Sequence, residues 1–410
     1  MAVRIPGQSP KLFPAYRVDA VVDTTAAGDT FTGYAVRALT LAWNAEEKGE
    51  DPARCRAILE DGIKYAVTAA ALSVTRAGAA ESIPHFEVVD AVVADLWDTE
   101  VENILLDCDP GLDDAAAIFL AAGSPRIHVL GITTVAGNQT IERVTKNAFF
   151  VAKMAGMGDV PIARGSARPL LRPQVQVCSE IHGETGLGVP VAEPERDPDP
   201  RPAAQFIVDV VMREPEKSVT LVATGPLTNV ALAARLEPKI VERVKQVVLM
   251  GGACHTGNVG PAMEFNIEND PEAAHIVFNE PWQVVMVGLD LTYQARADKS
   301  VRDAFKAIGT PAGDFMYQTL ETFAENYKAW RGFDAPPLHD PCAMAYVIDP
   351  TVMEVVPVPI NVETKGALTT GMTVCDFRRR APEGCHTFAA LKLNVPQFWE
   401  MLISSVKAIG

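Results

Sequence analysis

The stretch from Asn103 to Leu120, NILLDCDPGLDDAAAIFL, decides how the rest of the chain is organised. An apolar run ends abruptly in closely spaced carboxylates, and a run of helix-forming residues follows them. This order predicts a buried strand over residues 104–106, a turn at Pro110-Gly111 and a helix that begins near Asp113. In open α/β sheets, ligands bind beyond the carboxyl ends of such strands. The acidic residues in question are Asp107, Asp109, Asp113 and Asp114.

The close spacing of these acids needs an explanation, because neighbouring ionised carboxylates repel one another. A helix N-terminus supplies only about half an elementary charge. A hard divalent cation supplies more, and Ca²⁺ takes oxygen ligands at about 2.3–2.6 Å. The motif therefore predicts a metal-carboxylate site at the carboxyl end of a parallel strand.

Other interpretations of the same motif compete with this one. A helix N-cap explains a single carboxylate or a pair, but not all of them. A helix-loop-helix calcium loop has acids at alternating positions, and the adjacent Asp113 and Asp114 break that alternation. A phosphatase of the haloacid dehalogenase type also has D-x-D after an apolar strand, which Asp107-Cys108-Asp109 resembles. That family has Thr or Val where this chain has Gly111, and the phosphatase stays open at this point.

Length and composition narrow the class of protein. The chain has 410 residues, which is more than one average domain, and 48% of them are hydrophobic. The net charge of -16 argues against nucleic acid or an anionic membrane surface as a partner. The 7 cysteines are scattered without a C-x-x-C pair, and no apolar run reaches membrane-spanning length. We therefore expect neither a zinc site nor a disulfide framework, and a cytoplasmic location.

The N-terminal part contains a loop of small residues, DTTAAGDTFTG over residues 23–33, that opens directly into a helical pattern. Small residues at a helix start let backbone N–H groups approach an anion, and an Asp there can accept a proton from a hydroxyl. The segment resembles the C-terminal signature of the ribokinase (PfkB) sugar kinases, and AAALSVTRAGAAESIP resembles the segment that follows it in that family. The resemblance implies an anion hole at Ala26, Ala27 and Gly28, a catalytic base at Asp29, and a monovalent-cation site near Asp23, Thr25, Gly78 and Ser82.

This resemblance covers only about the last third of such a kinase, because the few residues before Asp23 leave no room for its sugar-binding half. We therefore interpret residues 1–98 as a truncated ribokinase-like segment without kinase activity, and residues 99–410 as a second domain. The alternative is a bifunctional enzyme in which a kinase acts on the product of the second domain.

From Val101 onward the chain repeats a pattern of apolar strand, polar loop and helix. Continuous Val/Ile/Leu runs separated by helices predict an α/β fold with an open, mostly parallel sheet covered on both faces. Polar residues follow several of the predicted strands, so they should converge near the carboxylates at one edge of the sheet. These residues are Asn138, Thr224, Asn258, Glu264 and Asn266.

Two further segments contain polar residues that we expect at the same edge of the sheet. The N…E-x-N cluster formed by Asn258, Glu264 and Asn266 has more hydrogen-bonding capacity than a plain loop needs, and it suits a polyhydroxylated ligand. His339 and Asp340 precede a Pro and an apolar helix, where Asp340 alone could be an N-cap. An N-cap does not explain His339 beside it.

Residues 101–410 resemble the inosine-uridine preferring nucleoside hydrolases along their whole length. The resemblance rests on DCDPGLDD, AGN, IHGETGLG, ATGPLTN, LMGG, GN…EFN and HDP, which occur in the same order. It implies a Rossmann-like α/β fold, hydrolysis of the N-glycosidic bond of ribonucleosides, a Ca²⁺ cofactor and a dimer or tetramer. It also displaces the phosphatase, which has no role for the last of these motifs.

The resemblance assigns roles on the sugar side of the site. Asp109 would be the general base, and Met250 would lie beneath the ribose. The Ca²⁺ ligands would be Asp109, Asp114, the backbone carbonyl of Thr224 and Asp340, and the ribose would be held by Asp113, Asn138, Asn258, Glu264 and Asn266. Asp107 would support the other acids.

On the base side, the resemblance implies that His182, Phe323, Tyr327 and His339 surround the leaving base. His339 would protonate it, since a base leaves poorly unless it is protonated, and Tyr327 would stack on it. The simpler alternatives are that Phe323 and Tyr327 form the buried stripe of an amphipathic helix, and that His182 only orients its loop. A non-catalytic nucleoside-binding protein is the alternative for the domain as a whole.

Overall fold

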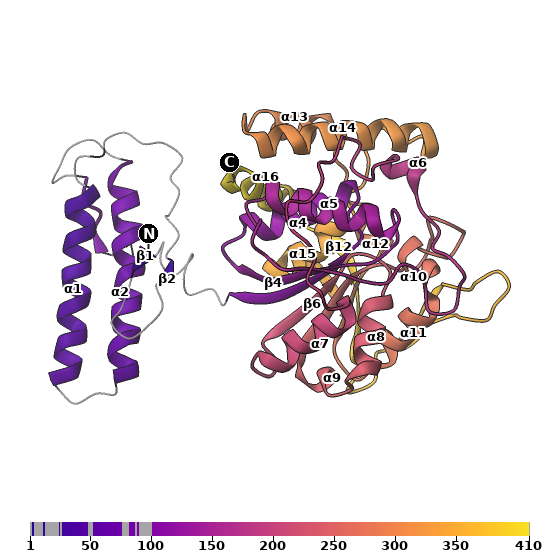
Figure 1. The fold of residues 1–410 in the computed structure, drawn as a ribbon, viewed down its shortest axis with the longest axis horizontal. Helices are drawn as coiled ribbons and strands as arrows, with labels where there is room; N and C mark the ends of the chain where they lie inside the picture. Colours follow the sequence, from indigo (N-terminus) through magenta and orange to yellow (C-terminus); the bar gives the residue numbers. More distant parts are fainter. Residues whose placement is uncertain are drawn as a thin grey trace. The chain divides into compact units, whose positions relative to one another are not determined.

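This computed structural model describes residues 2–3, 11–12, 24, 27–47, 52–75, 82–86, 88–89 and 101–409. The chain separates into two compact units, Met1–Glu100 and Val101–Gly410, which are described one at a time (Figure 1). In the described part of the chain, no helix is both long enough and apolar enough to cross a membrane.

The first unit contains a pair of long helices, α1 (Ala27–Glu47) and α2 (Pro52–Ser73), that pack against each other (Figure 1). Gly62 lets the helices approach, because a Cβ there would lie 1.9 Å from the Cβ of Ala38. The short strands β1 (Ala2–Val3) and β2 (Lys11–Leu12) form an antiparallel pair. The alternating apolar residues of KLFPAYRVDAVV predict a strand or hairpin arm, and VVDAVVADLWDTE predicts a closing helix and a short linker. Most of both segments lies outside the described residues.

The second unit is built on an 8-stranded sheet with the order β5-β4-β3-β6-β7-β8-β12-β9. Every neighbouring pair is parallel except β12 and β9, which are antiparallel. This confirms the predicted open, mostly parallel α/β sheet. The strands are β3 (Glu102–Cys108), β4 (Ile127–Thr134), β5 (Ile162–Arg164), β6 (Val219–Ala223), β7 (Val244–Met250), β8 (Val284–Val287), β9 (Met353–Pro357) and β12 (Thr387–Leu393).

Both faces of this sheet are covered, which explains why its strands are apolar at successive positions. In β3, Ile104 and Leu106 belong to one hydrophobic core and Leu105 to the other. The first core holds helices from distant parts of the sequence (Figure 1). They are α4 (Leu112–Gly123), α5 (Ile141–Met154), α13 (Lys299–Lys306), α14 (Pro311–Arg331), α15 (Asp340–Ile348), the 3-10 turn η1 (Pro350–Val352) and α16 (Val395–Ile409).

The other face carries a more local set of helices (Figure 1). A small antiparallel hairpin, β10 with β11, packs beside them through Ile360 and Val362. The elements are α7 (Ala203–Arg213), α8 (Thr228–Leu236), α9 (Ile240–Arg243), α11 (Pro271–Asn279), β10 (Ile360–Val362) and β11 (Thr373–Cys375).

Three short helices lie in loops that follow strands or precede α7 and α11, and they carry polar residues of the predicted site. They are α6 (Ser179–His182), α10 (Phe265–Asn269) and α12 (Leu289–Thr292). The predicted helix near Asp113 is α4, which begins at Leu112, directly after β3 and its turn. A strand rather than a helix therefore precedes the acids, which excludes the helix-loop-helix calcium loop.

Candidate active site

The carboxyl ends of the parallel strands enclose a cavity of about 560 Å³ that is open to solvent. Most of the predicted site residues line it, from strand ends, loops and helices that are distant in the sequence: Asp113, Asn138, His182, Thr224, Met250, Asn258, Glu264, Asn266, Phe323, Tyr327, His339 and Asp340. Asp109 and Asp114 adjoin these residues without lining the cavity.

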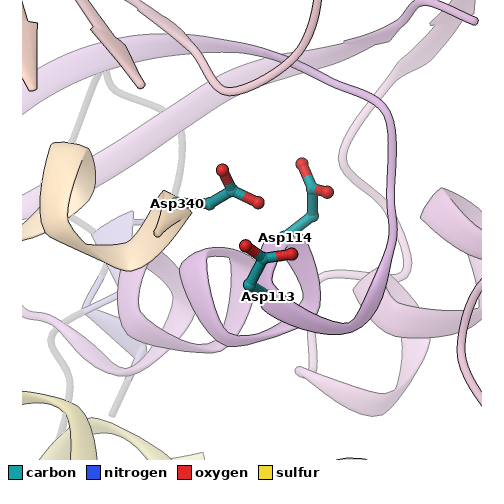
Figure 2. Close-up of side chains that lie close together, drawn as sticks. All are labelled: Asp113, Asp114 and Asp340. Carbon is teal, nitrogen blue, oxygen red and sulfur yellow. The ribbon is translucent and has the colours of Figure 1, made fainter. Parts of the chain in front are cut away.

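Three buried carboxylates from two helix starts form the centre of the site. Asp113 and Asp114 lie in the first turn of α4, and Asp340 is the first residue of α15. Their side chains point toward one another, and one carboxylate oxygen of each lies within 4.8 Å of the others (Figure 2). The sequence prediction grouped Asp114 and Asp340 with Asp109, whereas the structure groups them with Asp113.

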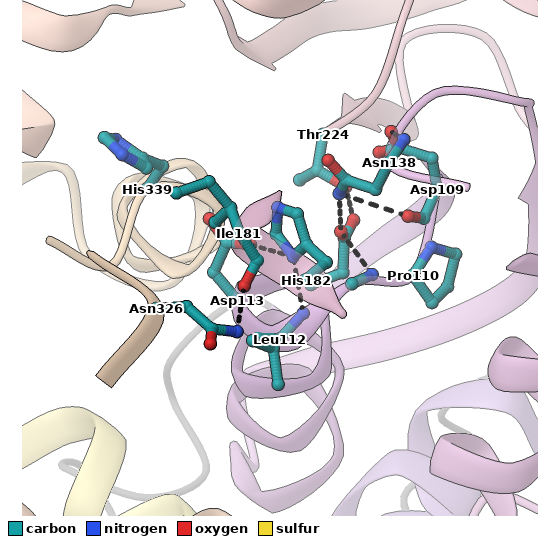
Figure 3. Close-up of polar contacts among 12 residues, drawn as sticks. Asp109, Pro110, Leu112, Asp113, Asn138, Ile181, His182, Thr224, Asn326 and His339 are labelled. Atoms are coloured by element: carbon teal, nitrogen blue, oxygen red, sulfur yellow. Dashed lines mark hydrogen bonds and ion pairs between the residues drawn. The ribbon is translucent and has the colours of Figure 1, made fainter. Parts of the chain in front are cut away.

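Asp109 is joined to this group through Asn138. The backbone N–H of Asn138 donates to Asp109 Oδ2 at 2.6 Å, and its side-chain amide donates to Asp114 Oδ2 at 3.1 Å (Figure 3). Glycines after two strands leave room for the Asp109 carboxylate, since a Cβ at Gly137 would lie 2.0 Å from Oδ2 and one at Gly225 would lie 2.6 Å from Oδ1. The AGN and ATG motifs therefore shape the space around Asp109.

The electrostatics of the acid group favour a bound cation. Burial raises the pKa of Asp109 and of Asp340 well above the usual value, and the neighbouring aspartates add to this effect. Burial and Asp114 raise the pKa of Asp113 to about 7. Two oxygens, Asp109 Oδ1 and Asp113 Oδ1, are buried without a hydrogen-bond partner. Uncompensated buried carboxylates of this kind fit a hard divalent cation.

No basic side chain supplies that compensation among residues 101–409. The basic group that approaches the acids is His182, whose Nδ1 lies 4.0 Å from Asp113 Oδ1. Burial, with a smaller effect of His339, lowers the pKa of His182 to about 3, so this ring is neutral near pH 7.

One acid of the motif does cap a helix. Asp114 Oδ2 accepts from the backbone N–H of Gly111 at 3.0 Å, and Asp114 Oδ1 accepts from the Thr224 hydroxyl at 2.8 Å. The N-cap of α4 is Gly111, and Asp114 is the N3 residue that bonds back to it, so helix capping accounts for Asp114 and leaves the other acids unexplained. Asp340 is not a cap, because the N-cap of α15 is His339.

Asp107 does not line the cavity and is buried among polar side chains of neighbouring segments. Its Oδ1 accepts from the Thr133 hydroxyl at 2.6 Å and from the Asn229 amide at 2.8 Å. Burial raises its pKa to about 7. Asn229 also donates to the Thr134 carbonyl at 2.9 Å, so it ties the ends of β3 and β4 together. Asn229 was missed from the sequence, although it stands in the ATGPLTN motif.

The N…E-x-N cluster uses much of its hydrogen-bonding capacity to hold its own loop. Glu264 is the N-cap of α10 and accepts from the backbone N–H groups of Asn266, Ile267 and Gly252. Asn266 donates through its side chain to the carbonyls of Thr224, at 2.8 Å, and Met250, at 3.1 Å. The Thr224 carbonyl, a predicted metal ligand, thus accepts one hydrogen bond and keeps a second lone pair.

His182 fixes the start of α4 while it lines the cavity. Its Nδ1 accepts from the backbone N–H of Leu112 at 3.1 Å, which leaves the proton of the neutral ring on Nε2 (Figure 3). A Cβ at Gly111 would lie 2.4 Å from this Nδ1, so the ring can approach only a glycine. His182 therefore both orients its loop and lines the cavity.

The base side of the cavity is aromatic. Phe323 and Tyr327 belong to the buried stripe of α14 and also line the cavity, and their rings meet edge to face at 4.9 Å. The Tyr327 hydroxyl lies 3.0 Å from His339 Nε2, and the Thr292 hydroxyl lies 2.7 Å from His339 Nδ1. Burial, followed by Arg331 and Arg296, lowers the pKa of His339 to about 3.

Several cavity residues gave no signal in the sequence. Tyr293 packs edge to face on His339 with ring centroids 5.6 Å apart, and Trp330 and Arg331 lie at the C-terminal end of α14. None of them stands in a polar motif, and only the packing of α12 and α14 brings them to the cavity. The other lining residues without a predicted role are Cys178 and Val259, together with Ile181 and Phe265, which stand within the IHGETGLG and EFN motifs.

The predicted kinase motif lies in the first unit. Ala27, Gly28 and Asp29 are the first three residues of α1, and Asp29 is exposed. Ser82 is buried. Ala26, Asp23, Thr25 and Gly78 lie outside the described residues.

An open parallel sheet with buried carboxylates, amides and aromatic rings around one cavity at its carboxyl edge defines an α/β enzyme for a small polar ligand. Residues 104–400 match the family model described as inosine-uridine preferring nucleoside hydrolase. The chain belongs to this family of enzymes, which confirms the assignment made from its motifs and excludes the phosphatase. Residues 6–85 match the pfkB family carbohydrate kinase model, which confirms the second resemblance.

Individual relatives agree with this assignment. The chain is 53% identical over 310 residues to an inosine-uridine preferring nucleoside hydrolase of Leishmania major, covering 75% of this chain and 98% of that protein. It is 42% identical over 276 residues to the pyrimidine-specific ribonucleoside hydrolase RihA of an Enterobacter species, covering 67% and 88%. A solved purine-preferring ribonucleoside hydrolase from Gardnerella vaginalis superposes with a TM-score of 0.71 at 31% identity, covering 75% and 99%.

Proposed function

We propose that this chain hydrolyses the N-glycosidic bond of ribonucleosides in a Ca²⁺-dependent reaction that yields ribose and a free base. The observation that carries the proposal is the buried group of Asp113, Asp114 and Asp340 beside Asp109, which has orphaned oxygens and, among the described residues, no ion pair with a lysine or arginine. Asp113 and Asp340 line a cavity whose lining also includes the amides of three asparagines and several aromatic rings. Such a lining suits a sugar on one side and a planar base on the other.

The residues proposed to hold the cation are Asp109, Asp114, Asp340 and the carbonyl of Thr224. All of them are oxygen donors, which is the ligand type that Ca²⁺ takes in proteins. When bound, the cation would orient the attacking water and the ribose diol and would lower the pKa of that water. Asp113 contributes an unpaired oxygen to the same space and is proposed to hold a ribose hydroxyl.

Asp109 is proposed to accept the proton of the attacking water. Its Oδ2 is held by the Asn138 N–H at 2.6 Å, and its Oδ1 has no partner. A positioned carboxylate with one free oxygen is suited to general base catalysis. Asn138 is therefore a positioning residue for Asp109 as well as a candidate sugar contact.

The ribose is proposed to lie over Met250, with its hydroxyls on Asn138, Asn258, Glu264 and Asn266. The bond cleavage passes through an oxocarbenium-like sugar, as in glycoside hydrolysis. Glu264 and the aspartates place negative charge around the region where that positive charge develops, which stabilises the transition state.

His339 and Tyr327 are proposed to deliver a proton to the departing base. Because the pKa of His339 is lowered to about 3, its ring is neutral near pH 7 and cannot act as a ready imidazolium. The 3.0 Å contact between Tyr327 and Nε2 supports a donor made of both groups, in which one replaces the proton that the other gives up. Phe323 and Tyr327 offer the base an aromatic wall.

Both a purine and a pyrimidine nucleoside are proposed as substrates, since the relative at 53% identity is named for inosine and uridine. The reaction would serve nucleoside salvage in the cytoplasm, in a dimer or tetramer of this chain. Residues 1–98 are proposed to be a kinase remnant that does not phosphorylate ribose, and incubation with ATP and ribose should yield no ribose phosphate.

The test is removal and return of the metal. A calcium chelator should abolish base release from inosine and uridine and lower the melting temperature, and added Ca²⁺ should restore both. The melting temperature reports cation binding by the acid group independently of catalysis. Full base release in chelator with an unchanged melting temperature would refute the proposal.

A further inference from the structure

Two cysteines lie on neighbouring segments outside the residues that line the cavity. Cys254 lies in the loop after β7, and Cys375 is the last residue of β11. A side chain on β11 fastens the loop to the hairpin. The Ala253 N–H donates to Thr373 Oγ1 at 2.8 Å, and that hydroxyl donates to the Ala253 carbonyl at 2.7 Å. Side chains two residues apart on a strand share a face, so Thr373 and Cys375 both face this loop.

Because Ala253 and Thr373 are hydrogen-bonded to each other, the thiols of Cys254 and Cys375 lie beside each other, and their side chains interact. Both are free thiols and both are partly exposed. Cys254 is anchored a second time, because its backbone N–H donates to Asp290 Oδ2 at 2.5 Å. The pair is therefore held in contact from both sides and can be reached from solvent.

We propose that Cys254 and Cys375 are an oxidisable dithiol that closes to a disulfide when it meets a low-molecular-weight disulfide. Neither the family motifs nor the catalytic proposal uses these residues. The two requirements for the bond, contact between the sulfurs and access for the oxidant, are both met by free thiols.

The order of attack follows from the environment of Cys254. Its hydrogen bond to Cys375, its burial and Asp290 all raise the pKa of the Cys254 thiol, which makes it a poor first nucleophile. Cys375 therefore attacks one sulfur of the small disulfide as a thiolate, forms a mixed disulfide and releases one small thiol. Cys254 then loses its proton, attacks the Cys375 sulfur and releases the second small thiol. The protein loses two electrons and two protons, and the small disulfide gains them.

The bond would join the loop that follows Met250 to the β10–β11 hairpin. This loop leads to Asn258 and Glu264, so the cross-link would restrain the ribose side of the cavity without touching the acid group. A cross-link between segments far apart in the sequence stabilises the fold mainly by restricting the unfolded chain. We expect base release to stay within about twofold of that of the reduced protein, since the loop is already fastened by Thr373.

The experiment treats the full chain with oxidised glutathione and compares it with protein kept in dithiothreitol. Thiol titration should fall by two from the 7 cysteines of the sequence, and non-reducing peptide mapping should show Cys254 joined to Cys375. The melting temperature should rise by roughly 4 °C or more. Cys254→Ser should trap one glutathionyl group on Cys375, whereas Cys375→Ser should abolish both the cross-link and the rise.

Cys385→Ser is the matched control, because the Cys385 thiol is also partly exposed but contacts only Thr387 among the interactions of the described residues. It should retain the cross-link and the rise in melting temperature. Retention of all thiols by oxidised wild-type protein would overturn the proposal. A stable glutathionyl adduct on Cys375 in the wild type, or an equal rise in Cys254→Ser, would overturn it as well.

Discussion

Two helices of this chain begin with the same ingredients and differ in what surrounds them. Helix α1 begins Ala27-Gly28-Asp29, and α4 follows Gly111 with Asp113 and Asp114 in its first turn. Asp29 is exposed, whereas Asp113 and Asp114 are buried. A Cβ at Gly28 would meet nothing within 4 Å, whereas one at Gly111 would lie 2.4 Å from His182 Nδ1.

The difference shows what turns a motif into a site. Both helix starts offer backbone N–H groups and an acid, which is a weak signal alone. At α4, the loops after β4 and β6 and the start of α15 bring Asn138, Thr224 and Asp340 against the acids. The described part of the first unit brings no such partners to Asp29. The following substitutions test this contrast, from the largest expected effect to the smallest.

Asp109→Ala and Asp340→Ala should each reduce base release from inosine and uridine by about 10³-fold or more, which corresponds to about 4 kcal/mol of barrier. Each removes a proposed cation ligand, and Asp109 is also the proposed base. The measurement is the rate of base release by absorbance, with circular dichroism to show that each variant is folded. Asp29→Ala is the matched control and should leave the rate unchanged. Comparable turnover in Asp109→Ala and Asp29→Ala would contradict the assignment of the active site to the start of α4.

His339→Ala should slow inosine hydrolysis by about 10²-fold or more, because the purine base needs a proton to leave. It should slow p-nitrophenyl riboside, whose leaving group needs no proton, by less than about tenfold. Tyr327→Phe keeps the ring but removes the hydroxyl 3.0 Å from Nε2, and it should show the same pattern with a smaller effect. Equal slowing of the two substrates in His339→Ala would remove His339 as a proton donor.

Gly111→Ala should displace His182 and Asn138, since its Cβ would lie 2.4 Å and 2.8 Å from their ring and amide nitrogens. We expect a loss of about 1–3 kcal/mol in the free energy of unfolding and a clear drop in base release. Gly28→Ala should change the free energy of unfolding by less than about 1 kcal/mol, because its Cβ meets open space. Urea unfolding and the inosine assay measure both. Equal effects of the two substitutions would contradict the packing around α4.

The last prediction concerns the pH dependence of stability that Glu264 causes in protein kept in chelator. Burial raises the pKa of Glu264 from 4.5 to about 7, so the folded protein binds a proton that the unfolded chain releases within this pH range. Glu264 therefore makes stability fall as pH rises from about 4.5 to about 7, by at most about 3 kcal/mol. Glu264→Gln should lose this dependence. The stability of this variant relative to that of wild type should therefore increase as the pH is raised from about 5 to about 8.

The check on Glu264 is urea unfolding at both pH values. Glu400→Gln, at an exposed position of α16, is the control and should follow the wild-type dependence. A parallel pH dependence in wild type and Glu264→Gln would show that this carboxyl does not titrate differently on folding.

Much of the fold and of the site could be predicted from local pattern. Apolar runs such as those of β3 and β4, followed by Asp109 and Asn138, indicated a parallel sheet with polar residues at one edge, because the two neighbouring strands must end side by side. The acids of α4 indicated a cation site, because so many carboxylates in so few residues repel one another.

What the sequence could not supply was the set of contacts between distant segments. Whether Asp109 or Asp113 shares the space with Asp340, and how Tyr293 and Arg331 reach the cavity, depends on the packing of α12, α14 and α15. The neutral state of His339 follows from its burial between Thr292 and Tyr327 rather than from its neighbours in sequence. The local sequence determined which residue types follow each strand. The tertiary structure decided the distances between the site residues and their protonation states, because both depend on which side chains pack together and exclude water.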